Sequence, residues 1–417
     1  MKGKYTYLEL FAGAGGLSEG FIRKGFLPIA HIEKDSYASL TIKTRMAYHF
    51  LKKSCHFNKK YADYSKDYIK REELYSMVPQ EIIDSVINEE IRRGNLKSLF
   101  TRIKQTMAKS NVNEINIIAG GPPCQAYSLI GRARDPYNME RDPRNYLYKL
   151  YAEFLKEFKP DFFVFENVPG LMSAGRGKLW EDVRATLRKA GYTVDYRLLN
   201  AYDFGVIQKR IRIIVIGWRN DIEAKYPEFG RIPGMTKYTV GNIFEDLPPL
   251  EPGEKIHYGN YISPPSEYLK RHGIRKDDDI LTQHIARRHN ARDRKIYRMV
   301  IERWEKEKWR LKYSELPEHL KTHKNQKSFE DRFKVVAADL PYSHTMVAHL
   351  AKDGHYFIHP DITQLRSISV REAARLQSFP DDYYFEGPMT AKFRQIGNGV
   401  PPLMAEKIAE KIMEMIE

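Results

Sequence analysis

The amino-acid sequence predicts an α/β fold built on a parallel sheet, with a second, smaller domain after residue 250. Short apolar runs alternate with longer amphipathic segments in the first half of the chain, as expected when crossover helices join parallel strands. After Leu250 this alternation stops and basic residues accumulate. The chain of 417 residues is also too long for one ordinary core and suits two domains.

The predicted elements follow from these runs. The strands are expected at residues 6–11, 27–32, 116–121, 161–166 and 211–218. Helices are expected over residues 17–25, 147–158 and, after a loop that begins at Gln395, at the C-terminus. Residues 48–113 are charged and mostly helical in pattern, so we interpret them as an insertion or a peripheral helical layer.

The formal net charge of +15 makes a polyanion the natural partner, and nucleic acid is the commonest one. The alternative is that the charge only keeps the protein in solution. Residues 255–336 carry 21 Lys and Arg against 12 Asp and Glu, with aromatic residues between them. Such a run is usually a solvated helix face, but its concentration in one region favours a DNA-facing surface. The candidate contacts there are Arg287, Arg288, Arg292 and Arg294.

Cysteine usage and hydropathy indicate a cytoplasmic protein. Two cysteines, Cys55 and Cys124, cannot form a disulfide framework and suit a reducing compartment. The N-terminal sequence lacks a signal-peptide core, and no segment approaches the roughly 18 uncharged apolar residues of a membrane span. We therefore expect no membrane partner.

A glycine cluster, Phe11 to Gly16, follows the first predicted strand. Gly13 and Gly15 let the backbone turn tightly and approach a nucleotide-like ligand, and the next helix offers free N–H groups. Glu33 closes the second strand, where a carboxylate can accept both ribose hydroxyls. NAD and S-adenosylmethionine sites share this pattern, and a purely structural turn is the alternative. The full dinucleotide fingerprint is missing, which favours S-adenosylmethionine.

Three further motifs end or begin predicted strands. Cys124 follows Gly-Gly-Pro-Pro on a loop, although a lone cysteine is more often an inert core residue. Its thiol ionises near about pH 8.5 and needs cationic or dipolar help to react. Glu166 ends a strand, where it is either functional or a solvated carboxylate. Alternation predicts Gln208, Arg210 and Arg212 on one strand face, as a surface stripe or a wall for a planar polar substrate.

Together these motifs resemble the DNA cytosine-5 methyltransferase family, of the bacterial restriction–modification or orphan type. The similarity continues in REAARLQSFPD at residues 371–381 and in GNGVPP at residues 397–402. The matching motifs follow the family's order over residues 5–35, 114–218 and 366–410. The resemblance implies a Rossmann-like S-adenosylmethionine-dependent methyltransferase sheet in residues 1–250, completed by residues 395–417. It implies a target-recognition domain in residues 251–394.

The resemblance also implies the chemistry. Cys124 attacks carbon 6 of a flipped-out cytosine, Glu166 holds ring nitrogen 3, and Arg212 holds the ring carbonyl, with Arg210 and Gln208 around the pocket. The implied cofactor residues are Phe11, Gly13, Gly15, Glu33, Pro123, Leu147 and Asn398. The implied DNA contacts are Gln208 and, on a loop expected to close over the site, Gln125, Ser128, Arg132 and Arg134. Asn95 stands nearest to where the family often has an adenine-binding Asp.

Other classes fit less well. His31-Ile32-Glu33 and Pro123-Cys124 mimic parts of a zinc nucleobase deaminase, but Tyr127 stands where a metal ligand belongs, so we expect no metal. Exocyclic-amine methyltransferases need a Pro-Pro-Tyr-type loop that the sequence lacks. RNA-methylating relatives share the catalytic motifs, but the long basic segment favours double-stranded DNA. A non-catalytic DNA-binding module is disfavoured by intact Cys124, Glu166 and Arg212. We expect a nucleoid-associated monomer, with any cognate restriction endonuclease acting separately.

Overall fold

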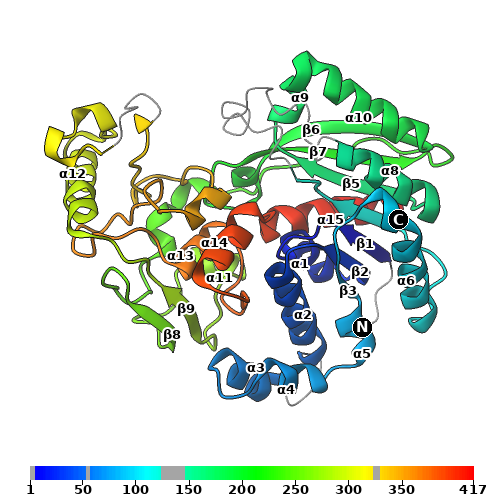
Figure 1. The fold of residues 1–417 in the computed structure, drawn as a ribbon, viewed down its shortest axis with the longest axis horizontal. Helices are drawn as coiled ribbons and strands as arrows, with labels where there is room; N and C mark the ends of the chain where they lie inside the picture. Colours follow the sequence, from blue (N-terminus) through cyan, green and yellow to red (C-terminus); the bar gives the residue numbers. More distant parts are fainter. Residues whose placement is uncertain (1–4, 53–56, 124–145, 323–328) are drawn as a thin grey trace.

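In the computed structural model, residues 5–52, 57–123, 146–322 and 329–417 are described. One seven-stranded sheet has the order β3–β2–β1–β4–β5–β7–β6 (Figure 1). The strands are β1 (Thr6–Leu10), β2 (Leu27–Glu33), β3 (Val86–Asn88), β4 (Ile117–Gly120), β5 (Phe162–Asn167), β6 (Tyr192–Asn200) and β7 (Ile211–Arg219). The predicted α/β class is therefore confirmed.

The sheet is largely but not wholly parallel. Strands β3, β2, β1, β4 and β5 pair in parallel, whereas β7 runs antiparallel to both β5 and β6. The expectation of a wholly parallel sheet was wrong at β7. Only residues 201–210, with the short 3-10 helix Ala201–Phe204, join β6 to β7. A connection without a crossover helix joins antiparallel neighbours, because parallel strands need a longer crossover.

Helices cover both faces of the sheet, and alternate residues of β1 supply the two cores. Tyr7 packs in a cluster with α1 (Gly16–Arg23) and α15 (Pro402–Ile416). Leu8 packs in a second cluster with α6 (Leu96–Lys109), α8 (Leu147–Phe158) and α10 (Lys178–Lys189). Successive residues of a strand point to opposite faces, so both faces of this sheet are buried.

Residues 48–113 are mostly helical, as predicted, but part of them belongs to the sheet. Helices α2 (Ser36–Leu51), α3 (Phe57–Ser65), α4 (Arg71–Ser76) and α5 (Gln80–Asp84) come first. Strand β3 then pairs with β2, with Val86 opposite His31. The interpretation as an insertion alone is therefore incomplete. None of the described helices has the length and apolar character of a bilayer-spanning segment.

The C-terminal part adds a two-stranded sheet, β8 (Lys255–Gly259) with β9 (Leu281–Ile285). Its helices are α11 (Glu267–Arg271), α12 (Ala291–Glu307), α13 (Val370–Leu376) and α14 (Met389–Asn398). Apolar residues between 296 and 365 form a cluster of their own around α12, which we call the α12 cluster. Helices α13 and α14 instead join the core that contains Tyr7. Packing therefore continues across the predicted boundary at residue 394.

Buried arginines at α13 connect these parts. Arg366, Arg371 and Arg375 are all almost fully buried. The Arg375 guanidinium lies 2.5 Å from Asp246 and 2.6 Å from Asp381. Burial alone would lower the pKa of Arg375, but the two carboxylates hold it well above its usual value. Buried charges persist only when paired, so this cluster fixes the second part of the chain against the first.

Candidate active site

The carboxyl ends of β1, β2, β4 and β5 meet at one edge of the sheet, where ligands bind in open α/β folds. The glycine cluster leaves β1, Glu33 ends β2, Gly120 ends β4, and Glu166 lies near the end of β5. The structure therefore brings described parts of three predicted motifs to a single edge.

The glycine turn beside Glu33 has the shape of a nucleoside cradle. Gly13 and Gly15 have φ values of 56° and 77°, in the left-handed region that favours glycine. The Gly13 N–H donates to Glu33 Oε2 at 2.8 Å, and the Asp35 N–H donates to Oε1 at 2.8 Å. A Cβ on Gly13 would meet no atom within 4 Å, so the space beside the turn is open. Burial raises the pKa of Glu33.

Asn88 is a neighbour of this cradle that the sequence analysis missed. It pairs with Glu33 across β2 and β3, and its side-chain amide donates to the backbone oxygen of Glu33 at 3.0 Å. The sequence signal that could have identified Asn88 is the short Val-Ile-Asn run inside a charged stretch. Asn95 lies beyond β3 and donates to Glu89 Oε1 at 2.6 Å. The end of β3 therefore contributes Asn88, not Asn95, beside Glu33.

The segment that leads to Cys124 is held against the end of β5. A Cβ on Gly121 would stand 2.6 Å from Glu166 Oε2 and 2.8 Å from the Glu166 carbonyl oxygen, so only glycine fits there. The Asn167 side-chain amide donates to the Pro122 carbonyl oxygen at 3.2 Å. Cys124 itself lies outside the described residues. Pro123, which precedes Cys124 in the chain, is half-buried and directly follows the hydrogen-bonded Pro122.

Glu166 and Arg212 form an ion pair at this edge. Arg212 Nε lies 2.8 Å from Glu166 Oε1, and the two side chains are 11% and 15% exposed. They come from neighbouring antiparallel strands, so the sheet fixes their separation. A carboxyl group beside a planar guanidinium can hold the polar edge of a flat ring through charge-assisted hydrogen bonds.

Gln208 and Arg210 do not line this pocket, because β7 begins only at Ile211 and both side chains turn into the core. The Gln208 side-chain amide donates to the Leu376 carbonyl oxygen at 2.9 Å. Arg210 donates to the Met346 carbonyl oxygen at 2.6 Å and to the Gly399 carbonyl oxygen at 3.0 Å. The predicted shared face with Arg212 was therefore wrong, and Gln208 is not placed to touch DNA.

These inward side chains support a predicted cofactor residue. Asn398 is exposed at the end of α14, between two glycines. Arg210 and Gln377 both donate to the Gly399 carbonyl oxygen, which fixes the turn that carries Asn398. Leu147 is half-buried as the first residue of α8. The predicted DNA contacts Gln125, Ser128, Arg132 and Arg134 lie outside the described residues.

The four candidate arginines differ in their exposure to solvent. Arg287 is half-buried and donates to the Ala351 carbonyl oxygen at 2.9 Å. Burial lowers the pKa of Arg287. Arg287 is therefore less exposed than its three neighbours in the set, and its contact with DNA stays a prediction. Arg288, Arg292 and Arg294 are exposed, in the segment that enters α12 and in its first turn.

His31 belongs to the interior of the protein. It is fully buried, and its Nε2 lies 2.8 Å from the Ser18 hydroxyl. Burial lowers the pKa of His31 to about 3, so the ring is neutral at physiological pH. Among the described residues, no group of three or more His, Cys, Asp and Glu side chains is arranged to hold a metal ion.

Solved structures share this fold. A prophage-encoded DNA modification methyltransferase of E. coli superposes with a TM-score of 0.63 at 22% sequence identity, covering 99% of both chains. A methyltransferase of Entamoeba histolytica superposes with a TM-score of 0.55 at 14% identity, covering 100% of both chains. At these identities the likeness establishes the fold alone, a mixed α/β fold with a largely parallel seven-stranded sheet.

The sequence comparisons define the family. The model of the C-5 cytosine-specific DNA methylases matches residues 83–414. The type II methyltransferase M.Bpa9945I of Bacillus paralicheniformis is 41% identical over 98% of both chains. M.XorII of Xanthomonas oryzae is 32% identical, over 98% of this chain and 84% of the relative. The chain belongs to the C-5 cytosine-specific DNA methylases, which confirms the predicted family and enzyme class.

The different positions of Arg210 and Arg212 predict different effects of the same conservative change. Lysine keeps the charge but loses the planar fork. Arg210→Lys should lower the free energy of unfolding by about 2 kcal/mol, because buried hydrogen bonds to backbone oxygens are lost. Arg212→Lys should leave the melting temperature nearly unchanged and reduce methyl transfer by about 100-fold or more. Thermal unfolding and a tritiated-methyl assay measure both effects, and equal stability of the two variants would contradict this division.

Proposed function

We propose that this protein transfers a methyl group from S-adenosylmethionine to carbon 5 of a cytosine in a specific duplex DNA sequence, through a covalent Cys124 intermediate. One observation carries the proposal. The segment before Cys124 packs against Glu166, which is paired with Arg212, at the same sheet edge as the glycine turn and Glu33. The described residues that lead to Cys124, a candidate ring-binding pair and a candidate nucleoside cradle thus lie at one edge of the sheet.

The cofactor fits the cradle. The two Glu33 oxygens each accept one backbone N–H and retain lone pairs for ribose hydroxyls. The open space at Gly13 admits a ligand close to the backbone. Phe11, Gly15, Pro123, Leu147 and Asn398 are the proposed remaining walls. When bound, S-adenosylmethionine supplies an electrophilic methyl group.

Glu166 and Arg212 would hold the target cytosine after it leaves the base stack, at a cost of a few kcal/mol. Arg212 can donate to the ring carbonyl oxygen, and a proton shared with Glu166 can stabilise ring nitrogen 3. These contacts would be made to the Watson–Crick edge of the cytosine, which is engaged in base pairing in the duplex. A stacked, paired cytosine therefore cannot bind in the site. The geometry therefore favours a flipped-out base.

The covalent step activates a poor nucleophile. The Cys124 thiolate forms a bond to carbon 6, and the electron pair displaced from the ring is stabilised through nitrogen 3 by Glu166. Carbon 5 then gains enamine character and would take the methyl group as the methyl–sulfur bond breaks, with the electron pair of that bond remaining on the cofactor sulfur. Loss of the carbon-5 proton restores the ring double bond and expels Cys124 as a thiolate. The net change replaces one proton of the base by one methyl group.

Residues 251–394 are the proposed target-recognition domain, and within it residues 255–336 carry 21 Lys and Arg against 12 Asp and Glu. Arg288, Arg292 and Arg294 remain as exposed candidates for contacts with DNA, together with Gln125, Ser128, Arg132 and Arg134. The type II relatives support a restriction–modification role, with any endonuclease acting separately. We propose a monomer that works in the cytoplasm on nucleoid DNA.

Mapping methylcytosine tests the reaction and its nucleophile. After incubation with genomic DNA and S-adenosylmethionine, bisulfite sequencing should show methylcytosine in one short sequence context. Cys124→Ser should abolish this signal while DNA binding persists, since only the thiolate adds to carbon 6. Cys55→Ser is the matched control and should remain fully active. Activity of Cys124→Ser within about tenfold of wild type would rule out the covalent role.

Salt dependence tests the basic face. Replacing Arg288, Arg292 and Arg294 by Gln should weaken DNA binding and reduce the slope of log K against log salt by about 0.9 for each phosphate that is no longer neutralised. S-adenosylmethionine affinity should not change. Arg93, Lys97 and Lys109 are exposed near or on α6, and their triple Gln variant removes the same charge elsewhere. Equal slopes for the two triple variants would show that the arginines at the start of α12 form a solvated surface and do not contact DNA.

A further inference from the structure

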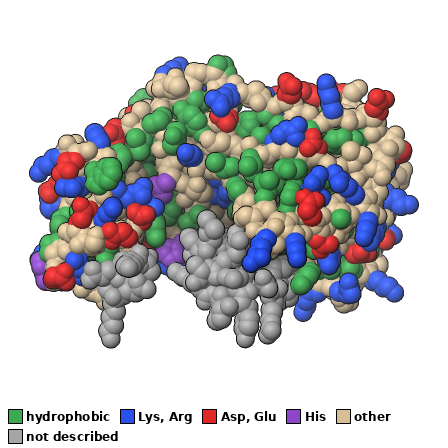
Figure 2. Space-filling view, turned by 90° about the horizontal axis from the view of Figure 1, so that it is seen from above, with side chains coloured by type: hydrophobic (Ala, Val, Ile, Leu, Met, Phe, Trp, Pro, Cys, Tyr) green, Lys and Arg blue, Asp and Glu red, His purple; other side chains and the backbone are tan. Residues whose placement is uncertain are grey.

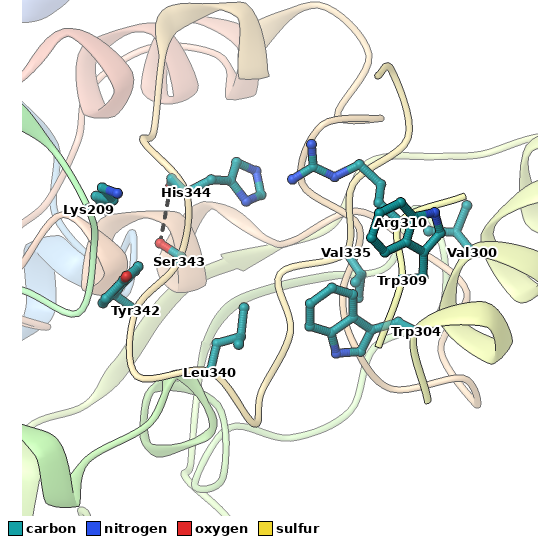
Figure 3. A pocket seen from close by; sticks show the side chains of 10 residues that line it. All are labelled: Lys209, Val300, Trp304, Trp309, Arg310, Val335, Leu340, Tyr342, Ser343 and His344. Atoms are coloured by element: carbon teal, nitrogen blue, oxygen red, sulfur yellow. Dashed lines mark hydrogen bonds between the residues drawn. The ribbon is translucent and has the colours of Figure 1, made fainter. Parts of the chain in front are cut away.

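A cavity of about 190 Å³ lies between the segment that enters β7 and the α12 cluster. Figure 3 shows Lys209, Tyr342 and Ser343 on one side of it and Trp304, Trp309 and Arg310 on the other. The other lining residues are Val300, Val335, Leu340 and His344. In the space-filling view, a hollow containing basic and histidine side chains separates the two parts of the molecule (Figure 2). We call this cavity the tryptophan pocket.

The aromatic surface of the tryptophan pocket is preformed by its two tryptophan side chains. The Trp304 indole N–H donates to Asp339 Oδ1 at 2.9 Å, which fixes its ring. Trp309 is 57% exposed, a large apolar area to leave in water. Val300 and Leu340 add aliphatic surface between them. Exposed aromatic surface beside a cavity is typical of a binding site.

The charged residues that line the pocket are basic. None of its lining residues is acidic. Lys209 is exposed, and the Arg310 guanidinium lies no closer than 3.8 Å to Asp331. Burial lowers the pKa of His344 to about 4, so this histidine adds no charge at neutral pH. Aromatic faces combined with Lys and Arg are the features by which proteins bind unstacked bases and their phosphates.

The pocket is tied to the catalytic strand. The Lys209 N–H donates to the Ser343 carbonyl oxygen at 2.9 Å, and Ser343 pairs with Gln208 in a β-bridge. Lys209 precedes Arg212 by three residues, so their Cα atoms lie at most about 11 Å apart. Base pairs are spaced about 3.4 Å along duplex DNA. One duplex bound at Arg212 therefore reaches the pocket within a few base steps.

We propose that the tryptophan pocket binds one unstacked nucleobase of the target duplex, other than the cytosine that is methylated. This inference rests on the proposed function, because it requires a duplex at Arg212. A cavity of about 150 Å³ holds a benzene ring, so this pocket has room for one ring of a base. Trp309 stacks on the base, while Lys209 and Arg310 contact the flanking phosphates. The pocket is then a determinant of the recognised sequence.

A double-mutant cycle between protein and DNA tests this interaction. The substrate is a duplex with the target sequence mapped by bisulfite sequencing, and single abasic sites replace each non-target base in turn. Trp309→Ala should lower kcat/KM on the intact duplex by about tenfold or more, and Trp309→Phe should restore most of it. At one position the abasic site should lower wild-type kcat/KM by a similar factor. At that position it should not lower the Trp309→Ala value further.

Controls separate base binding by the pocket from a loss of stability and from failure of the proposed function. Tyr68→Ala removes an exposed aromatic side chain outside residues 251–394 and should leave kcat/KM unchanged. Lys209→Gln should reduce the salt slope of duplex binding by about 0.9. Wild-type methylation with additive losses at every abasic position would overturn the pocket alone. No wild-type methylation of any cytosine would overturn the proposed function, and the pocket with it.

Discussion

The close approach of Gly121 to Glu166 is the constraint on which the catalytic edge depends. Strands β4 and β5 pair in parallel, with Gly120 opposite Phe165, so Gly121 leaves the end of β4 beside Glu166, which still belongs to β5. A side chain at Gly121 would collide with the Glu166 carboxylate and backbone. Because Gly121 has none, the described chain that leads toward Cys124 passes directly beside Glu166, which forms the ion pair with Arg212. The rest of the fold holds this edge in position and brings the other site residues to it.

The motifs shared with the family contain two kinds of residue. Glu33, Glu166 and Arg212 lie at the edge where ligands can reach them. Arg210 and Arg375 lie in the interior, where they hold backbone oxygens and buried carboxylates. A buried guanidinium without such partners would be costly, so these positions are as restricted as those at the edge. Motif membership alone therefore does not identify a residue that touches substrate.

Local patterns predicted the edge, and contacts between distant parts of the chain decided what was missed. Apolar runs followed by glycine or a carboxylate placed Gly13, Glu33 and Glu166 at strand ends, because parallel strands share one carboxyl edge. The inward turn of Gln208 depends on Leu376, and the burial of Arg287 depends on Ala351. The tryptophan pocket joins Lys209 to residues 300–344. No spacing within one segment carries such information, and the direction of β7 likewise depended on a connection that the strand pattern does not show.

Covalent trapping on modified DNA measures the central claim most directly. In a duplex with 5-fluorocytosine at the target position, carbon 5 cannot lose its substituent as a proton, so the bond between Cys124 and carbon 6 should persist. The account predicts a protein–DNA adduct that survives denaturing electrophoresis. Formation of this adduct should require S-adenosylmethionine and should fail with Cys124→Ser. No adduct on a duplex that the wild-type protein methylates, or an adduct that forms equally well with Cys124→Ser, would contradict the covalent mechanism.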